Sequence, residues 1–200
     1  MNRNDVQAEV VSRLRDKSYS GIIYAATGFG KSRVCILALT EIKKKKGLDK
    51  VLWLVDRAEL RDKDVPSEIQ KWNPEVAEHV TLACYVSIHK HVGEWDVVIM
   101  DEADRITPRV DMYLDKCKIH SFIAVTATKP PKVKEDLLLK RASVVFNKSL
   151  DEASDEGLIA PYRMCIIWTR LDNEKKYITA GNAKKRFMNT EYKQYLWYNK

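Results

Sequence analysis

The stretch GIIYAATGFGKS, residues 21–32, decides the fold. It starts with an apolar run that predicts a buried β-strand, and the residues from Lys31 onward begin a helical pattern. Between them, Gly28 and Gly30 allow the backbone to turn with its N–H groups pointing inward, because glycine has no Cβ. A strand, a glycine-containing turn and a helix in this order predict a phosphate-binding loop, to which the start of the helix adds partial positive charge.

The side chains of this loop predict how a nucleoside triphosphate is bound. Lys31 is expected to reach the β- and γ-phosphates as a point charge and to take part in catalysis, while the Ser32 hydroxyl ligates Mg²⁺. The general pattern GxxxxGK[ST] has glycine at the position of Ala25, so the match is incomplete. The alternative, a glycine-rich turn with an unrelated lysine, does not explain the flanking strand and helix. The loop residues assigned to ATP binding are Thr27, Gly28, Phe29, Gly30, Lys31 and Ser32.

A pair of acids follows a later strand. Residues 96–100 form a hydrophobic strand that runs into DEAD, residues 101–104. Ligands of open α/β sheets bind at the carboxyl ends of strands, so these acids are expected beside the phosphate loop. Asp101 is assigned to Mg²⁺ opposite Ser32, and Glu102 is assigned the catalytic task of orienting and deprotonating the attacking water. The alternative is a helix start that carries acids because of its dipole.

Apolar runs alternate with helix-like segments along the chain. A first helix is expected from residue 5 to 17 with Asn4 as its N-cap, and a second from 31 to 46, before Gly47. The alternation predicts an α/β fold with a mainly parallel central sheet and helices on both faces. Further strands are expected at residues 51–55, 80–83, 97–100 and 122–125, with one more at 144–146 or 163–168.

Composition and charge narrow the class of protein. The chain has 200 residues, of which 45% are hydrophobic, which suits one packed domain of ordinary size. No apolar run approaches the roughly 18 residues of a membrane helix, so no membrane partner is expected. The 4 cysteines are widely spaced and match no metal-ligand pattern. The net charge of +7 suits a polyanionic partner such as nucleic acid.

Three of these segments resemble motifs of the superfamily 2 helicases and translocases. AATGFGKS, residues 25–32, resembles motif I, which commonly has alanine at the position of Ala25. DEAD at residues 101–104 resembles motif II, and TAT at residues 126–128 resembles motif III. The resemblance covers most of residues 5–170. It implies a RecA-like P-loop NTPase fold and an ATP hydrolase of helicase type that uses ATP and Mg²⁺.

The resemblance also implies contacts with nucleic acid. Thr126 and Thr128 of motif III would couple the state of the bound nucleotide to the binding of nucleic acid. Arg57, in a stretch similar to motif Ia, and Ser87 would contact the nucleic-acid backbone. Residues 149–162 are more similar to the type I and III restriction subunits and phage UvsW-like DNA helicases than to RNA helicases. This similarity favours DNA as the partner and the cytoplasm of a bacterium or phage-infected host as the location.

Gln7 matches the glutamine that reads adenine through its amide in this family. The aromatic residue that often precedes this glutamine is replaced by Val6 here. Asn4 and Gln7 also fit the spacing of a helix capping box, which is the alternative role for this glutamine. Gln7 is therefore assigned to ATP binding as an expectation from the resemblance.

Residues 1–170 are expected to form the first RecA-like helicase domain, which binds ATP. Residues 171–200 are expected to be a helical tail or the start of a linker to a second RecA-like domain, with aromatic and apolar positions at Phe187, Tyr192, Tyr195, Leu196 and Tyr198. Members of the family carry that second domain, which supplies arginines to the ATP site, and no counterpart is found in this sequence. We expect the domain in cis, or a partner protein in trans, and poor hydrolysis by this chain alone.

These observations lead to one main function and two alternatives. The main hypothesis is an ATP-dependent DNA helicase or translocase of which this chain is the first motor domain. The first alternative is a non-catalytic adaptor that binds ATP and nucleic acid or a partner protein. The second alternative keeps the ATPase and replaces DNA by RNA.

Overall fold

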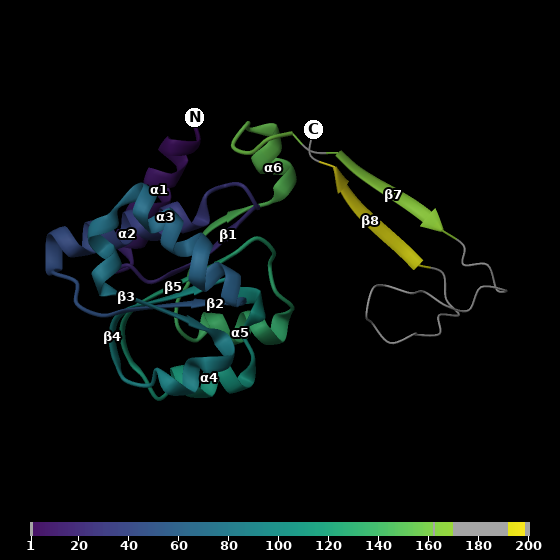
Figure 1. Ribbon diagram of the computed structural model, residues 1–200. Helices are drawn as coiled ribbons and strands as arrows, with labels where there is room; N and C mark the ends of the chain where they lie inside the picture. Colours follow the sequence, from purple (N-terminus) through teal and green to yellow (C-terminus); the bar gives the residue numbers. More distant parts are fainter. Residues whose placement is uncertain (1, 162, 170–191, 199–200) are drawn as a thin grey trace. The chain divides into compact units, whose positions relative to one another are not determined.

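The computed structural model of the chain describes residues 2–161, 163–169 and 192–198, which fall into two compact units (Figure 1). The first unit is Met1–Ala160 and the second is Pro161–Lys200. The boundary between them therefore precedes the domain boundary expected at residue 170. None of the helices in the described ranges is long and apolar enough to cross a membrane.

The first unit contains a six-stranded sheet and the helices that cover it. Its strands are β1 (Gly21–Ala25), β2 (Val51–Val55), β3 (Val80–Cys84), β4 (Glu94–Asp101), β5 (Lys118–Thr126) and β6 (Val144–Lys148). Its α-helices are α1 (Arg3–Asp16), α2 (Lys31–Lys46), α3 (Val65–Trp72), α4 (Pro108–Leu114), α5 (Lys132–Leu139) and α6 (Leu150–Asp155). Short helices are the π-helical η1 (Leu60–Asp64) and the 3₁₀-helical η2 (Pro74–His79), η3 (Tyr85–Lys90) and η4 (Ala103–Arg105).

The sheet is parallel throughout and has the strand order β3-β2-β4-β5-β1-β6. β5 lies between β1 and β4, with Tyr24 opposite Thr126 and Asp101 opposite Val125. The carboxyl ends of β1, β5 and β4 therefore meet at one edge of the sheet. This confirms the predicted α/β, RecA-like architecture and the predicted strands at this edge.

Both faces of the sheet are buried, which explains why its strands read as continuous apolar runs. Alternate residues of β2 point to opposite faces: Trp53 packs in one core with α1, α2 and α3, and Leu52 and Leu54 pack in the other with α4 and α5. Figure 1 shows the same division, with α1 to α3 on one side of the sheet and α4 and α5 on the other. The predicted two-sided cover of helices is confirmed.

The first helix begins earlier than predicted. Its N-cap is Asn2, whose side chain accepts from the backbone N–H of Asp5, while the Asp5 carboxylate accepts from the backbone N–H of Asn2. The expected cap at Asn4 is therefore wrong, because the Asn2 and Asp5 pair satisfies both donors of a capping box two residues earlier. Asn4 lies inside the first turn and accepts a hydrogen bond from Arg33. The second helix has the predicted bounds.

An ion-pair cluster holds α1 against α2. Arg15 Nη2 donates to Glu41 Oε2 at 3.0 Å, and Lys45 Nζ lies 2.6 Å from Glu41 Oε1. The hydrogen bond from Arg15, followed by that from Lys45, lowers the pKa of Glu41 to about 2, against the opposing effect of burial. The charged form of Glu41 therefore stabilises the folded state above its ordinary pKa of 4.5, and this contribution is lost as the pH falls toward 2.

Replacing Glu41 by glutamine is expected to lower the free energy of unfolding at neutral pH by about 1 kcal/mol, because the cluster is partly exposed and screened by solvent. The difference from the wild type should shrink as the pH falls from 4.5 toward 2. Urea denaturation over this pH range measures it. Glu9→Gln is the matched control: Glu9 pairs with Arg13 within the exposed face of α1, and its loss should have little effect. An equal loss in both variants would contradict the proposed role of the cluster.

The second unit contains β7 (Arg163–Thr169) and β8 (Tyr192–Tyr198), which pair antiparallel. The helix expected over Tyr192, Tyr195, Leu196 and Tyr198 is therefore wrong in this range, and Phe187 lies outside the described residues. The aromatic residues fit both helical spacing and a strand, and their strong β propensity prevails where a partner strand is present. The strand expected at 144–146 or 163–168 of the central sheet is the first of these, β6.

Candidate nucleotide and nucleic-acid site

The phosphate loop connects β1 to α2 and has the backbone that phosphate binding requires. Gly28 and Gly30 have φ angles of 86° and 89°, in the left-handed region that favours glycine. Phe29, between them, is 1% exposed and stacks on Phe146 with ring centroids 5.3 Å apart. Thr27 is exposed at the tip of the loop. The loop is therefore held from below by Phe29 while its outer residues remain accessible.

Lys31 and Ser32 are the first residues of α2, where helix N–H groups and the helix dipole favour an anion. The Lys31 ammonium group lies 3.4 Å from the carbonyl oxygen of Ala25, below the loop. Both side chains are half-buried. In this position a lysine can exchange a single weak hydrogen bond for a phosphate group.

Asp101 ends β4 and lies at the same edge of the sheet as the loop. Its side chain is 7% exposed, and its Oδ1 accepts from the backbone N–H of Glu102 at 3.0 Å. Burial, followed by the charge of Glu102, raises the pKa of Asp101 to about 6, and the charge of Lys31 opposes both. Lys31 and Asp101 are therefore close enough to interact, as the common edge of β1, β5 and β4 requires.

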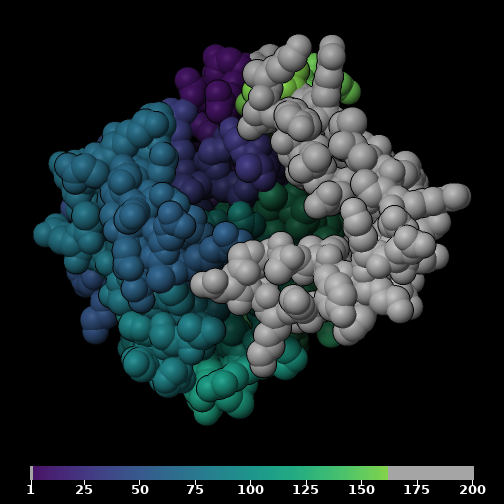
Figure 2. Space-filling model, turned by 45° about the vertical axis from the view of Figure 1, so that its right-hand side comes forward, coloured from purple at the N-terminus to yellow at the C-terminus, as the bar shows by residue number. Residues whose placement is uncertain are grey.

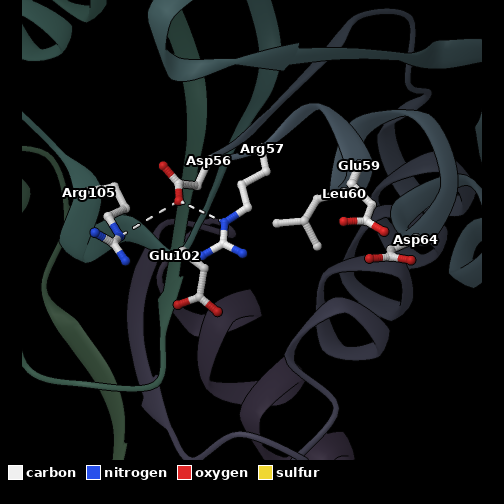
Figure 3. Close-up of a pocket in the computed structure, with 7 residues that line it drawn as sticks. All are labelled: Asp56, Arg57, Glu59, Leu60, Asp64, Glu102 and Arg105. Atoms are coloured by element: carbon white, nitrogen blue, oxygen red, sulfur yellow. Dashed lines mark ion pairs between the residues drawn. The ribbon is translucent and has the colours of Figure 1, made fainter. Parts of the chain in front are cut away.

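Glu102 has φ 52° and ψ 53°, a left-handed conformation that is strained for a residue with a side chain. Strain of this kind persists only where the surroundings hold it, and it often marks functional positions. The conformation turns the chain sharply after β4, so that Asp101 is buried while Glu102 is half-exposed. Glu102 lines a cavity of about 410 Å³ together with Asp56, Arg57 and Arg105. Figure 3 shows these side chains.

The residues present suit a magnesium ion. Asp101 is a buried carboxylate whose raised pKa reports an unfavourable charge, and a divalent cation beside it would stabilise that charge. The residues that the structure describes contain no group of three or more His, Cys, Asp or Glu side chains that could hold a metal. Mg²⁺ bound with a nucleotide needs no such group, because phosphates and waters supply most of its ligands. Ser32 and Asp101 are the side chains at this edge of the sheet that could hold such an ion.

The residues after β5 contact those after β4. The hydroxyl of Thr126, which is fully buried, lies 3.1 Å from Asp104 Oδ1 and 3.2 Å from the carbonyl oxygen of Thr128. A hydroxyl has one proton, so Thr126 donates to one of these acceptors at a time. The backbone N–H of Thr128 donates to the same hydroxyl at 3.3 Å. One of these alternatives joins the predicted coupling residues to the acidic segment, and the other closes within the loop after β5.

The two residues assigned to nucleic acid follow neighbouring strands. Arg57 comes after β2, and Ser87 lies in η3 after β3, which pairs with β2 in register. The Arg57 side chain is 73% exposed, and its guanidinium lies 3.7 Å from the Asp56 carboxylate (Figure 3). The Ser87 hydroxyl donates to the carbonyl oxygen of Cys84 at 2.8 Å. The structure thus brings both residues to the same edge of the sheet as the phosphate loop, and Arg57 is the more exposed of the two.

Gln7 contacts the phosphate loop directly. Its side-chain Nε2 donates to the carbonyl oxygen of Phe29 at 2.6 Å, and its Oε1 accepts from Arg33 Nη1 at 2.8 Å. The residue is 1% exposed. In this structure both amide atoms are engaged in holding the loop. Each of these atoms keeps one further hydrogen-bonding site, the second Nε2 proton and the second Oε1 lone pair, through which a base could be read as the resemblance implies.

Comparison with known families places these motifs in context. The family model described as "Type III restriction enzyme, res subunit" matches residues 1–131 of the 200-residue chain, which includes the phosphate loop, the acidic segment and TAT. The chain belongs to this family. It is a helicase-like ATPase domain of superfamily 2, as the motifs implied. None of the curated proteins compared with the chain matches it.

Solved structures with a similar fold include an ATPase core, a restriction-modification enzyme and a helicase. The ATPase core of a Sulfolobus solfataricus SWI2/SNF2 protein in complex with double-stranded DNA is 20% identical, with a TM-score of 0.58 over 68% of this chain and 35% of that chain. A nuclease-deletion mutant of the type ISP restriction-modification enzyme LlaGI, in complex with a DNA substrate mimic, is 18% identical, with a TM-score of 0.56 over 76% of this chain and 20% of that chain. The UvsW helicase of bacteriophage T4 is 10% identical, with a TM-score of 0.53 over 64% and 54%.

The chain thus spans about a third of the SWI2/SNF2 core and about half of UvsW. These similarities show the fold of the chain. The activities of these longer proteins are not thereby shown for it.

Several residues that were not predicted connect the motifs to one another. Lys134 of α5 donates to the carbonyl oxygen of Asp104 at 2.6 Å, and Arg105 lies 3.8 Å from Asp56 and 3.7 Å from Asp104. The buried Tyr85 hydroxyl donates to the carbonyl oxygen of Asp101 at 2.7 Å. Asp104 and Arg105 stand in or beside the DEAD segment and were visible in the sequence. Tyr85 stands in the stretch 85–87 that the resemblance assigned to nucleic-acid contact, without a role in holding Asp101, and Lys134 carries no local signal.

Proposed function

We propose that this chain binds MgATP and DNA and couples ATP hydrolysis to movement along, or remodelling of, DNA. The observation that supports this best is the common edge of the sheet, where Lys31 after β1 lies close enough to Asp101 after β4 to oppose the rise of its pKa. Phosphate-binding and acidic groups that converge in this way suit a single metal-bound triphosphate. Membership of the res-subunit family agrees with such an activity.

In the proposed reaction, backbone N–H groups of the loop and the Lys31 ammonium bind the β- and γ-phosphates. Ser32 and Asp101 hold Mg²⁺, which supplies positive charge to the phosphate oxygens. Glu102, which is half-exposed where Asp101 is buried, orients the attacking water and accepts its proton. Each role needs only side chains that already lie at this edge of the sheet.

Coupling to DNA is proposed to pass through the hydroxyl of Thr126. Its two alternative acceptors, Asp104 and the Thr128 carbonyl, join the acidic segment to the loop after β5. A change in the acidic segment on hydrolysis would shift the hydroxyl between them. Arg57 and Ser87 are proposed to contact phosphates of the DNA backbone, since they follow β2 and β3 at the same edge.

A second RecA-like domain, in cis or in a partner protein, is proposed to complete the ATP site with arginines. An arginine supplied across an interface contributes roughly 10³- to 10⁵-fold to phosphoryl transfer, so this chain alone is proposed to hydrolyse ATP slowly. DNA is preferred over RNA because of the segment at residues 149–162 and because two proteins of similar fold were solved with DNA or a DNA mimic. The proposed site of action is the cytoplasm of a bacterium or phage-infected host.

Replacing Lys31 by alanine tests the proposal. MgATP binding, measured by isothermal titration calorimetry, is expected to weaken at least ~10-fold, because a charge-assisted contact with phosphate is lost. Lys44→Ala is the matched control, since Lys44 lies exposed in the last turn of the same helix. Its loss should leave the affinity unchanged. Absence of MgATP binding to the wild type, or equal affinity of both variants, would contradict the proposed nucleotide site.

The DNA part of the proposal is tested in the same preparations. ATP turnover is measured with and without double-stranded DNA. Adding DNA should raise the rate, and should raise it more in a longer form that carries a second RecA-like domain. A nucleotide-gated adaptor would bind MgATP and DNA with no such rise. Competition between matched DNA and RNA strands over a salt series separates the two nucleic acids, because phosphate contacts alone give them similar salt slopes.

A further inference from the structure

A second cavity, of about 410 Å³, opens directly beside the phosphate loop. It lies where α1, the start of α2 and α3 come together, and Gly30 of the loop forms part of its wall. Figures 1 and 2 show these helices side by side on one side of the first unit, with the purple N-terminal helix and the blue surface around α3 flanking α2. The cavity is lined by Arg3, Asn4, Gln7, Gly30, Arg33, Glu68, Lys71 and Trp72.

The wall opposite α1 is an aromatic ring with a guanidinium group above it. The Arg33 guanidinium carbon lies 4.1 Å from the centroid of the Trp72 ring. The indole Nε1 of Trp72 donates to Glu68 at 2.7 Å, and the ring remains 39% exposed. The Arg33 guanidinium also donates to Asn4 and Gln7. Both planar groups are thus fixed from several sides and still accessible from the cavity.

Trp72 carries the only aromatic ring among the residues described as lining this cavity. Val6, at the position where the family often has an aromatic residue, is 2% exposed and packs in the core. The amide of Gln7 is buried, bonds Phe29 and Arg33, and offers no aromatic face. The cavity beside Glu102 is lined by carboxylates, arginines and Leu60, without an aromatic ring or a residue of the phosphate loop. A nucleotide whose phosphates occupy the loop can therefore place its planar base against the ring of Trp72.

We propose that the base of the nucleotide packs against the Arg33 and Trp72 pair, so that α3 supplies the aromatic contact that position 6 lacks. This inference rests on the proposed function and assigns the base-binding part of that same site. Base–aromatic stacking tolerates any base, because every base has a π face, and a guanidinium group extends the platform. Lys71, whose ammonium lies 4.9 Å from the same ring, is 61% exposed and can leave the ring when a base enters.

A comparison of two ligands isolates the base contact. MgATP and magnesium tripolyphosphate share the phosphate chain, but only the first carries a base. Trp72→Leu keeps an apolar side chain and removes the aromatic face, so MgATP affinity should fall about 10-fold while tripolyphosphate affinity stays the same. Trp72→Phe keeps an aromatic face and should retain most of the MgATP affinity. Titration calorimetry of the wild type and both variants with each ligand gives the values.

A second measurement needs no variant. If the base lies on Trp72, MgATP should change the tryptophan fluorescence of the wild-type chain, and tripolyphosphate should not. Equal weakening of both ligands in Trp72→Leu would show that the ring only supports the fold. Unchanged MgATP affinity in Trp72→Leu, or the same fluorescence response to both ligands, would also overturn the base contact. Failure of the proposed function itself is distinct, because then neither ligand binds the wild type.

Discussion

Glu102→Gln is expected to slow ATP hydrolysis by this chain about 10³-fold while leaving MgATP bound. Glutamine has nearly the shape of glutamate but cannot accept the proton of the attacking water. The substitution also removes the negative charge that, after burial, raises the pKa of Asp101 most strongly. MgATP affinity should therefore be equal to that of the wild type or higher. A loss of turnover without a loss of binding is the signature of a residue that acts on the reaction rather than on the nucleotide.

Single-turnover hydrolysis with protein in excess over labelled ATP measures the rate, because it detects reactions far slower than steady-state assays. Glu94→Gln is the matched control: Glu94 begins the same strand, β4, at the opposite end of the sheet. Its loss should leave hydrolysis unchanged. An unchanged rate in Glu102→Gln, with DNA present and a second RecA-like domain supplied, would contradict the catalytic role of Glu102. A parallel loss of binding would instead point to a role in holding the nucleotide.

Much of this arrangement was predictable because parallel sheets impose simple rules. The apolar runs at β2, β4 and β5 are continuous since both faces of the sheet are buried, and they read as strands without ambiguity. The carboxyl ends of parallel strands share one edge, so a phosphate loop after one strand and acids after another had to converge. The positions of Lys31, Asp101 and Glu102 follow from this rule.

What escaped prediction depends on contacts between distant segments. Asn2 and Asn4 are the same residue type, and Asn2 is the N-cap because Asp5 completes a capping box with it. Trp72 and Lys134 reach the site from helices that pack beside it, and nothing in their neighbouring sequence indicates this. The segment Tyr192–Tyr198 has helical spacing and β-forming residues at once, and its pairing with β7 decides the outcome.

Gly30→Ala is expected to destabilise the chain by about 3 kcal/mol and to weaken nucleotide binding with it. Gly30 is the N-cap of α2 with φ 89°, where an alanine is strained. A Cβ there would also lie 2.5 Å from Gln7 Nε2. The end of a flexible side chain normally moves aside, but this amide is buried and holds Phe29 and Arg33. Moving it breaks both hydrogen bonds.

Gly157→Ala, just after α6, separates the two causes. Gly157 has a positive φ of 67°, and a Cβ there would meet nothing within 4 Å. Its replacement should show only the strain of the positive φ, about 1 kcal/mol. Urea denaturation of both variants gives the difference, which reports the contact with Gln7. Equal destabilisation of the two would mean that Gln7 moves freely and that the loop does not depend on it.

A double substitution then tests whether Gln7 and Gly30 act as one unit. Gln7→Ala alone removes the two hydrogen bonds, and Gly30→Ala in that background no longer meets an amide. The combined destabilisation should therefore be smaller than the sum of the two single effects, by roughly 1 to 2 kcal/mol. Additive effects would place Gln7 outside the support of the loop. A coupled result would mean that the buried amide positions the backbone carrying the phosphate-binding N–H groups, whatever else it contacts when a nucleotide is bound.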